Sequence, residues 1–106
     1  MARYRMSDGT VIDTKRSSAF WDEVRYSDGS NLVGKSSGSQ WDYEILYRSR
    51  RGRFYIEHTS CMQGKLSRCE WVSNEEACRW LLTNDYDVRD DDFPVDLKDL
   101  VDEIVE

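Results

Sequence analysis

Large apolar residues alternate with polar ones in the middle of the chain. From Trp41 to Tyr47 every second position carries Trp, Tyr, Ile and Tyr, and in 54–58 Phe, Ile and His alternate with Tyr and Glu. A period of two is typical of a β-strand with one covered face. Gly52 lies between the two runs and tolerates the positive φ of a tight turn. The pattern therefore predicts a β-hairpin over 42–58.

Shorter runs of the same kind predict further strands. The expected strands are 4–6, 10–12, 22–26, 42–47, 53–58 and 68–72. Consecutive strands joined by short turns form an antiparallel meander, which can have one covered face and one face open to water.

Helical signals begin only at residue 73. Ser73-Asn74-Glu75-Glu76 is a capping box, in which the serine and the second glutamate exchange hydrogen bonds with the backbone. The helix that follows is expected to bury Ala77, Trp80 and Leu81 and to end near residue 84. A second helix is predicted to begin at about Pro94, because proline suits the first helical position. Its apolar stripe is 97, 100, 101 and 104, and residues 85–92 form an acidic connector.

Strands first and helices last predict an α+β fold: an antiparallel β-meander with two C-terminal helices packed on one face. We expect a single domain over 1–106. It divides into two strand-turn units (1–40), the β-hairpin and a third strand (41–72), and two helices (73–106).

The first forty residues contain an internal echo at a spacing of 20. Eight of the 19 positions from 4 to 22 recur identically 20 residues later, among them Ser7-Asp8-Gly9 as 27–29 and Trp21 as Trp41. Asp accepts local backbone hydrogen bonds and Gly takes positive φ, so each Ser-Asp-Gly predicts a β-turn. Two copies are too few for a solenoid.

Charge is unevenly distributed. The chain carries −6 overall, with +2 in residues 1–60 and −8 in residues 61–106. The acidic part predicts either solvated helical faces or a surface that docks on a basic site, as in DNA-mimicking proteins. No apolar run approaches the ~20 residues of a membrane helix, and the N-terminus lacks a secretory apolar core. A water-soluble cytoplasmic protein without a membrane partner is expected.

One segment matches a nucleotide-binding motif. Residues 29–36, Gly-Ser-Asn-Leu-Val-Gly-Lys-Ser, fit the phosphate-loop pattern G-x-x-x-x-G-K-[ST]. That loop works between a buried parallel strand and a helix. Here a short polar run precedes it and Ser37-Gly38-Ser39 follows, which begins a helix poorly. We interpret the match as a coincidence.

The cysteines and the single histidine indicate no catalysis. His58, Cys61, Cys69 and Cys78 are spaced by three, eight and nine residues and lack the C-x-x-C pair of common zinc sites. Structural thiols are favoured over zinc or a nucleophile, since buried free cysteine is common. No carboxylate pair stands out. We therefore predict a non-enzymatic protein without metal or cofactor.

The predicted hairpin tip carries the candidate binding residues. Arg48, Arg50, Arg51 and Arg53 can bind carboxylates or phosphates, and Tyr47, Phe54 and Tyr55 could stack on bases. Three interpretations stay open: a solvated turn, a protein-binding surface, and a ribbon that binds nucleic acid. A second candidate surface is the acidic run Asp90, Asp91 and Asp92.

The run Leu46-Tyr47-Arg48-Ser49-x-x-Gly52-Arg53-Phe54-Tyr55, followed by Val72-Ser73-x-Glu75-Glu76-Ala77-x-x-Trp80-Leu81, resembles small bacterial proteins carried on prophages and plasmids. The resemblance covers residues 41–83 and supplies no catalytic residues. It implies an accessory role that modulates a host system. We therefore expect a protein-interaction module, a regulator or inhibitor encoded by a mobile element, with nucleic-acid binding through 47–55 as the alternative.

Overall fold

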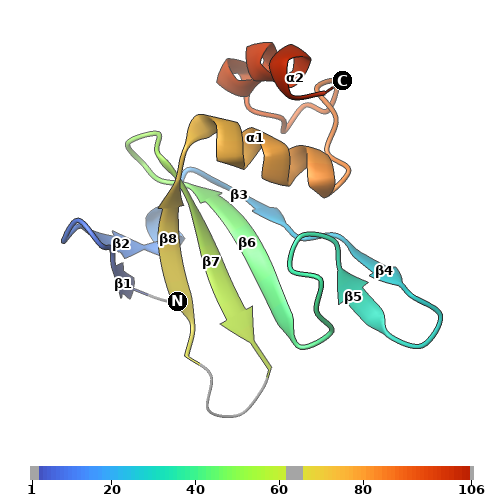
Figure 1. The fold of residues 1–106 in the computed structure, drawn as a ribbon. Helices are drawn as coiled ribbons and strands as arrows, with labels where there is room; N and C mark the ends of the chain where they lie inside the picture. The colour runs from blue at the N-terminus through green and yellow to red at the C-terminus, as the bar shows by residue number, and fades with distance from the viewer. Residues whose placement is uncertain (1–2, 62–65, 106) are drawn as a thin grey trace.

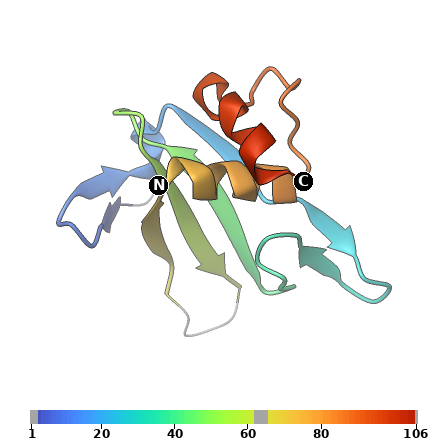
Figure 2. The same ribbon diagram turned by 45° about the horizontal axis from the view of Figure 1, so that its top comes forward.

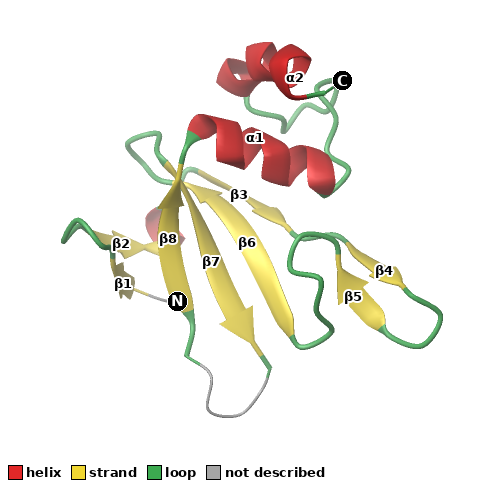
Figure 3. Ribbon diagram, viewed as in Figure 1, coloured by secondary structure: helices red, strands yellow, loops and turns green. Residues whose placement is uncertain are grey.

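A computed structural model describes residues 3–61 and 66–105. Its centre is an antiparallel sheet in the order β3-β6-β7-β8, formed by Ala19–Asp22, Asp42–Arg48, Phe54–Ser60 and Arg68–Val72 (Figure 1). Two hairpins flank it: β1 (Arg3–Arg5) with β2 (Val11–Asp13), and β4 (Arg25–Ser27) with β5 (Leu32–Gly34). Strands and helices are segregated along the chain, so the predicted α+β class is confirmed (Figure 3).

The β6–β7 hairpin forms where the alternation predicted it. Tyr47 pairs with Tyr55 across the two strands, and the turn runs from Ser49 to Gly52. The Ser49 N–H donates to the Arg53 carbonyl at 2.7 Å, and the Arg53 N–H donates to Ser49 Oγ at 3.1 Å. Gly52 has a φ of +90°, which a side chain would disfavour.

The sheet is covered on both faces near this turn, which corrects the expectation of one covered face. The fully buried residue of β6 is Leu46, on the face opposite to 41, 43, 45 and 47. Leu46 packs with Trp21 and Phe54 beneath helix α1 (Asn74–Thr83). On the other face Tyr55 packs with Met6 and Ile12 of the N-terminal hairpin. Large residues on the two faces of the sheet therefore pack into two separate hydrophobic cores, one beneath α1 and one beneath the N-terminal hairpin.

The helices cover one face, as predicted. The capping box at Ser73 is present, and Ala77, Trp80 and Leu81 are buried against the sheet. After the acidic connector, a 3-10 turn η2 (Val95–Leu97) leads into α2 (Lys98–Ile104). Helix α2 lies across α1 on the side away from the sheet (Figures 1 and 2).

The two Ser-Asp-Gly segments that recur 20 residues apart form two hairpin turns. Asp8 Oδ1 accepts the Thr10 N–H at 3.0 Å, and Asp28 Oδ1 accepts the Ser30 N–H at 3.0 Å. Gly9 and Gly29 have φ values of +88° and +104°. Both predicted turns are therefore present, in the β1–β2 and the β4–β5 hairpins. The packing is not repeated, because Trp21 is 4% exposed in the core whereas Trp41 is 51% exposed.

The expected strand 22–26 is wrong, because the chain leaves the sheet in its middle. Strand β3 ends at Asp22 and β4 begins at Arg25. Between them the Val24 N–H donates to the buried Asn84 side chain at 2.9 Å. The Glu23 side chain turns towards the loop after β5. These long-range partners bend the chain out of the sheet.

Candidate anion-binding site

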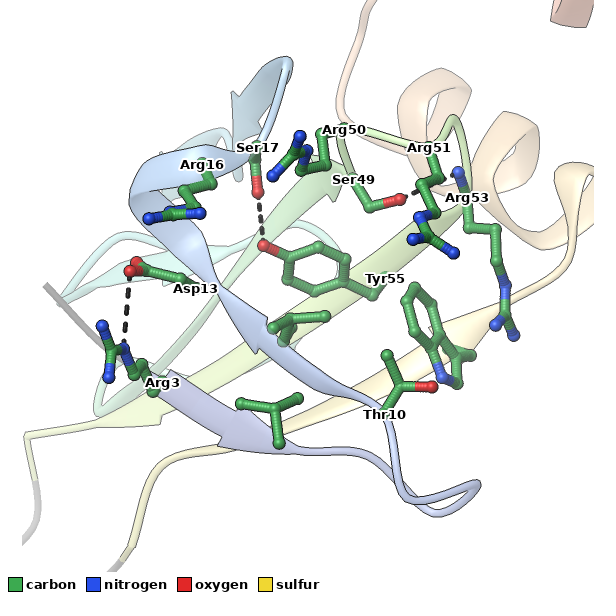
Figure 4. Close-up of a pocket in the computed structure, with 13 residues that line it drawn as sticks. Arg3, Thr10, Asp13, Arg16, Ser17, Ser49, Arg50, Arg51, Arg53 and Tyr55 are labelled. Carbon is green, nitrogen blue, oxygen red and sulfur yellow. Dashed lines mark hydrogen bonds and ion pairs between the residues drawn. The ribbon is translucent and has the colours of Figure 1, made fainter.

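A hollow of about 660 Å³ lies between the N-terminal hairpin and the β6–β7 turn (Figure 4). Its walls come from β1, β2, the following 3-10 turn η1 (Thr14–Arg16), the β6–β7 turn, β7 and β8. Five arginines line it, against one acid, Asp13. We call it the arginine hollow; its arginines are Arg3, Arg16, Arg50, Arg51 and Arg53.

Two of these arginines are engaged within the protein. Arg3 Nε lies 3.6 Å from Asp13 Oδ2. Arg53 Nη1 lies 3.3 Å from Asp8 Oδ2, and its guanidinium lies 3.8 Å from the centre of the Trp71 ring. Both contacts fix the side chains along the walls of the hollow. Stacking on Trp71 adds a cation–π attraction.

The other three, Arg16, Arg50 and Arg51, are exposed. None of their side chains has an ion pair or a hydrogen bond with a residue in 3–61 or 66–105. Arg50 and Arg51 are two of the predicted binding residues, and both are exposed at the hairpin turn. Three like charges gathered in one hollow repel each other. An anion bound there would relieve that repulsion.

The floor of the hollow is the buried Tyr55. Its side chain is fully buried, stacks on Tyr47 at 5.1 Å between ring centres, and meets the edge of Trp71. Its hydroxyl forms a short hydrogen bond with Ser17 Oγ (Figure 4). Burial raises the pKa of Tyr55 to about 12, so the phenol stays neutral. The expected stacking of bases on Tyr55 and Phe54 is wrong, because both side chains are fully buried.

Tyr47 is also committed to the fold. Its hydroxyl donates to Glu57 Oε1 at 3.3 Å, and the Tyr4 hydroxyl donates to Glu57 Oε2 at 2.5 Å. Glu57 is 7% exposed. Burial, followed by the nearby Glu57 charge, raises the pKa of Tyr47. Its hydroxyl supports a buried carboxylate and is not directed to a partner.

Arg48 lies on the other face of the sheet from the hollow. Its two terminal nitrogens bind the carboxylate of Asp96 at 3.0 and 2.7 Å, and the guanidinium lies 4.8 Å from the Phe54 ring centre. The side chain is 27% exposed. Arg48 therefore joins the hairpin to the C-terminal segment and is not part of the hollow.

The predicted acidic surface lies apart from the hollow. Asp90, Asp91 and Asp92 are exposed, and the Asp92 carbonyl accepts the Trp21 indole N–H at 3.0 Å on the helical side of the sheet. Asp90 Oδ2 accepts the Asp87 N–H at 2.8 Å. The structure thus separates this run from Arg50 and Arg51.

The segment that matches the phosphate-loop pattern binds a carboxylate of the protein itself, that of Glu23. Glu23 Oε2 accepts the Ser36 N–H at 3.0 Å, the Ser36 hydroxyl at 2.8 Å and the Ser37 N–H. A Cβ at Gly34 would lie 2.4 Å from Glu23 Cδ. Lys35, the motif's lysine, binds Asp85 at 2.5 Å. The loop follows a hairpin strand and precedes no helix, so the motif is structural.

His58 lies between two carboxylates on the helical face of the sheet. Nδ1 is 3.1 Å from Glu44 Oε2 and Nε2 is 2.7 Å from Glu70 Oε1. The hydrogen bond with Glu44 is the main reason that the pKa of His58 is raised. Glu44 also accepts the Trp80 indole N–H at 2.9 Å. These contacts link the sheet to helix α1 and account for the histidine structurally.

The cysteines show no sign of activation. Cys78 is buried, as predicted, and its thiol points to the Leu97 carbonyl at 3.7 Å. Burial raises the pKa of Cys69 to about 12, the opposite of what a nucleophile needs. Cys61 is exposed. Within the described ranges, no group of three or more His, Cys, Asp or Glu side chains could hold a metal ion.

The sequence did not identify Arg3, Arg16 and Ser17 as part of the site. Arg16 follows Lys15 in the polar arm after the first Ser-Asp-Gly turn, and that basic pair was the available signal. Its position beside Arg50 depends on the N-terminal hairpin packing over Tyr55. That packing is set by Met6 and Ile12, which are buried there.

No helix in the described part of the chain is long and apolar enough to cross a membrane. Comparison of the chain with protein-family models, curated proteins and solved structures gave no match.

Proposed function

We propose that this chain is a non-enzymatic protein-interaction module that holds an acidic segment of a partner protein in the arginine hollow. The observation that supports the proposal is the group of three exposed arginines, Arg16, Arg50 and Arg51, without partners among the described residues. They gather in one hollow of a protein whose net charge is −6. Elsewhere in the chain, arginines such as Arg48, Arg79 and Arg89 bind carboxylates.

The form of the hollow suits a chain segment. Its volume of about 660 Å³ lies in the usual range of ligand sites, roughly 300–1,000 Å³. Arg3 and Arg53 contact Asp13 and Asp8 along its walls, whereas Arg16, Arg50 and Arg51 remain available to a ligand. Arginine forms strong, paired hydrogen bonds with carboxylates and is enriched at protein interfaces.

Nucleic-acid binding is the second candidate, supported by the same exposed guanidinium groups. Two observations make it the weaker one. An extended phosphate backbone would also meet the acidic surface of a protein with pI near 4.8. Tyr55 is enclosed and Trp71 is covered by Arg53, so the hollow offers no open aromatic platform for bases.

The proposal extends to biological role through the sequence resemblance to proteins of prophages and plasmids. A small acidic protein with one cationic hollow could regulate or inhibit a host protein by occupying its acidic segment. Regulation of this kind needs binding only and no catalytic group.

Fluorescence anisotropy with labelled Asp- and Glu-rich peptides of about ten residues, which span roughly 33 Å when extended, tests the proposal. The double variant Arg50→Glu/Arg51→Glu should lose at least about tenfold in affinity, since each reversal turns attraction into repulsion. The double variant Arg79→Glu/Lys98→Glu is the matched control: it changes the net charge equally, at exposed positions on α1 and α2.

An equal loss of affinity in both double variants would show that binding depends only on the net charge of the protein, and would contradict the proposal. Loss only in Asp91→Lys/Asp92→Lys, tested with basic peptides, would move the interface to the acidic connector. A steeply salt-dependent gel shift with single-stranded DNA that disappears in Arg50→Glu/Arg51→Glu would favour the second candidate.

A further inference from the structure

The three unpaired arginines of the hollow do not lie evenly around it. Arg16 and Arg50 flank Ser17, whose hydroxyl meets that of Tyr55 at the floor, while Arg51 lies further along the turn (Figure 4). Two guanidinium groups and two hydroxyls are thus grouped at one end of the hollow. Trp71 and the engaged Arg53 also line the hollow.

The chain itself shows what it uses to bind a carboxylate. Asp96 is bound by one arginine, Arg48, through two nitrogens. Asp87 is likewise bound by one arginine, Arg89, and the carboxylate of Glu23 is bound without any arginine. One guanidinium is enough for a single negative charge in this protein. Two unpaired guanidinium groups beside two hydroxyls exceed that need.

A phosphate monoester matches this group of two guanidinium groups and two hydroxyls better than a carboxylate does. It carries about −1.5 to −2 charges near pH 7 and three acceptor oxygens. Two guanidinium forks can bind two of these oxygens, and the Ser17 hydroxyl can donate to the third when the Tyr55 hydroxyl donates to Ser17. The Tyr55 phenol keeps its proton because its pKa is raised to about 12 by burial. The ester oxygen would point outward to the rest of the ligand.

We propose that the arginine hollow recognises a phosphorylated side chain in the partner's acidic segment, with the phosphate bound by Arg16, Arg50 and Ser17. This inference rests on the proposed function and names the anchoring group. Arg51 then remains for a carboxylate next to the phosphorylated residue. A phosphopeptide is favoured over a nucleic acid because five arginines line this hollow whereas the chain as a whole carries −6.

The test uses three labelled peptides of the same acidic sequence, about ten residues long, with phosphoserine, glutamate or serine at the centre. Affinities are measured by fluorescence anisotropy on the full chain at pH 7.5 and pH 5.0. The phosphoserine peptide should bind at least about tenfold more tightly than the glutamate peptide at pH 7.5. The advantage should shrink at pH 5.0, where the phosphate (second pKa about 6) loses one charge.

Variants locate the phosphate. Arg16→Ala and Arg50→Ala should each remove most of the phosphoserine advantage while the glutamate peptide changes less. Arg79→Ala, an exposed arginine of α1, should leave it intact. Because Arg16 and Arg50 have no partner in the described parts of the fold, both variants should keep the wild-type melting temperature, which circular dichroism checks. Ser17→Ala should weaken phosphoserine binding by a smaller factor.

Equal affinity for the phosphoserine and glutamate peptides would overturn this inference and leave the proposed function standing. Binding of none of the three peptides would overturn both. A phosphoserine advantage that persists in Arg16→Ala and Arg50→Ala would show that the phosphate lies elsewhere and would overturn the assignment.

Discussion

Arg48 and Arg50 lie two residues apart on one hairpin, yet the structure gives them opposite roles. Arg48 binds Asp96 with two nitrogens and lies over Phe54, whereas Arg50 is exposed, with no partner in the described segments. Replacing each with alanine therefore separates an arginine that stabilises the fold from one available to a ligand. We expect the two variants to differ clearly in their free energy of unfolding.

The magnitude follows from the contacts that each variant removes. The Arg48–Asp96 pair is partly exposed, at 27% and 47%, so it contributes about 0.5–1 kcal/mol. The guanidinium over Phe54 adds about 0.5–1 kcal/mol. Arg48 Nε–H also donates to the Gly52 carbonyl at 3.3 Å, which adds about 0.5 kcal/mol. Arg48→Ala should therefore lower the free energy of unfolding by about 1.5–2.5 kcal/mol. Arg50→Ala should change it by less than about 0.5 kcal/mol, with a slight rise if relief of repulsion in the hollow dominates.

Urea unfolding followed by tryptophan fluorescence measures both values, because the chain has four tryptophans. The dependence of the free energy on urea should be equal in the two variants, so that midpoints can be compared. Asp96→Ala in the Arg48→Ala background should add little, since the pair is already broken. An Arg50→Ala loss as large as that of Arg48→Ala would refute the division of roles.

Three further predictions concern the fold. Gly34→Ala should lower the free energy of unfolding by about 1–3 kcal/mol, because the Glu23 carboxylate must leave the N–H groups of Ser36 and Ser37. In a Glu23→Ala background, urea unfolding should show a much smaller loss of stability for the same substitution. Equal losses in the two backgrounds would contradict the role of Gly34 in making room for Glu23. The raised pKa of His58 means that its contribution to stability is complete below the ordinary value of 6.5 and is lost as pH rises through the raised value. His58→Gln should therefore destabilise most below pH 6.5, and in a urea series the penalty should shrink as pH rises above that value. A penalty that grows with pH would show the sign to be wrong. When the native protein is titrated with a disulfide reagent, Cys61 should react first, and Cys69 and Cys78 should react only after the protein unfolds. Rapid reaction of Cys78 would mean that the helical core opens readily.

Local signals in the sequence predicted most of the elements. The alternation at 41–58, the capping box at Ser73 and the Ser-Asp-Gly turns each correspond to an element or turn in the structure. These features depend on neighbours within a few residues. The break between β3 and β4 was missed because its causes, the contacts of Val24 with Asn84 and of Glu23 with the loop after β5, span 60 and 13 residues.

Only part of the candidate site could be predicted, because the rest depends on contacts between residues distant in the sequence. Charge and turn chemistry indicated that the hairpin tip faces water, and Arg50 and Arg51 do so. Nothing local distinguishes them from Arg48, whose partner Asp96 is 48 residues away. The enclosure of Tyr55 depends on Met6 and Ile12. A cationic tip could be predicted, but a hollow with a buried floor required the packing of the N-terminal hairpin.

The central claim is that Arg16, Arg50 and Arg51 bind an anionic segment. Its most direct test is a titration of the isotope-labelled chain with the phosphoserine peptide, followed by NMR of the arginine side-chain N–H groups. The account predicts saturable shifts of the Nε–Hε signals of these three arginines, with those of Arg79 and Arg89 unmoved. Shifts confined to Arg79 and Arg89, or spread evenly over all arginines, would contradict it.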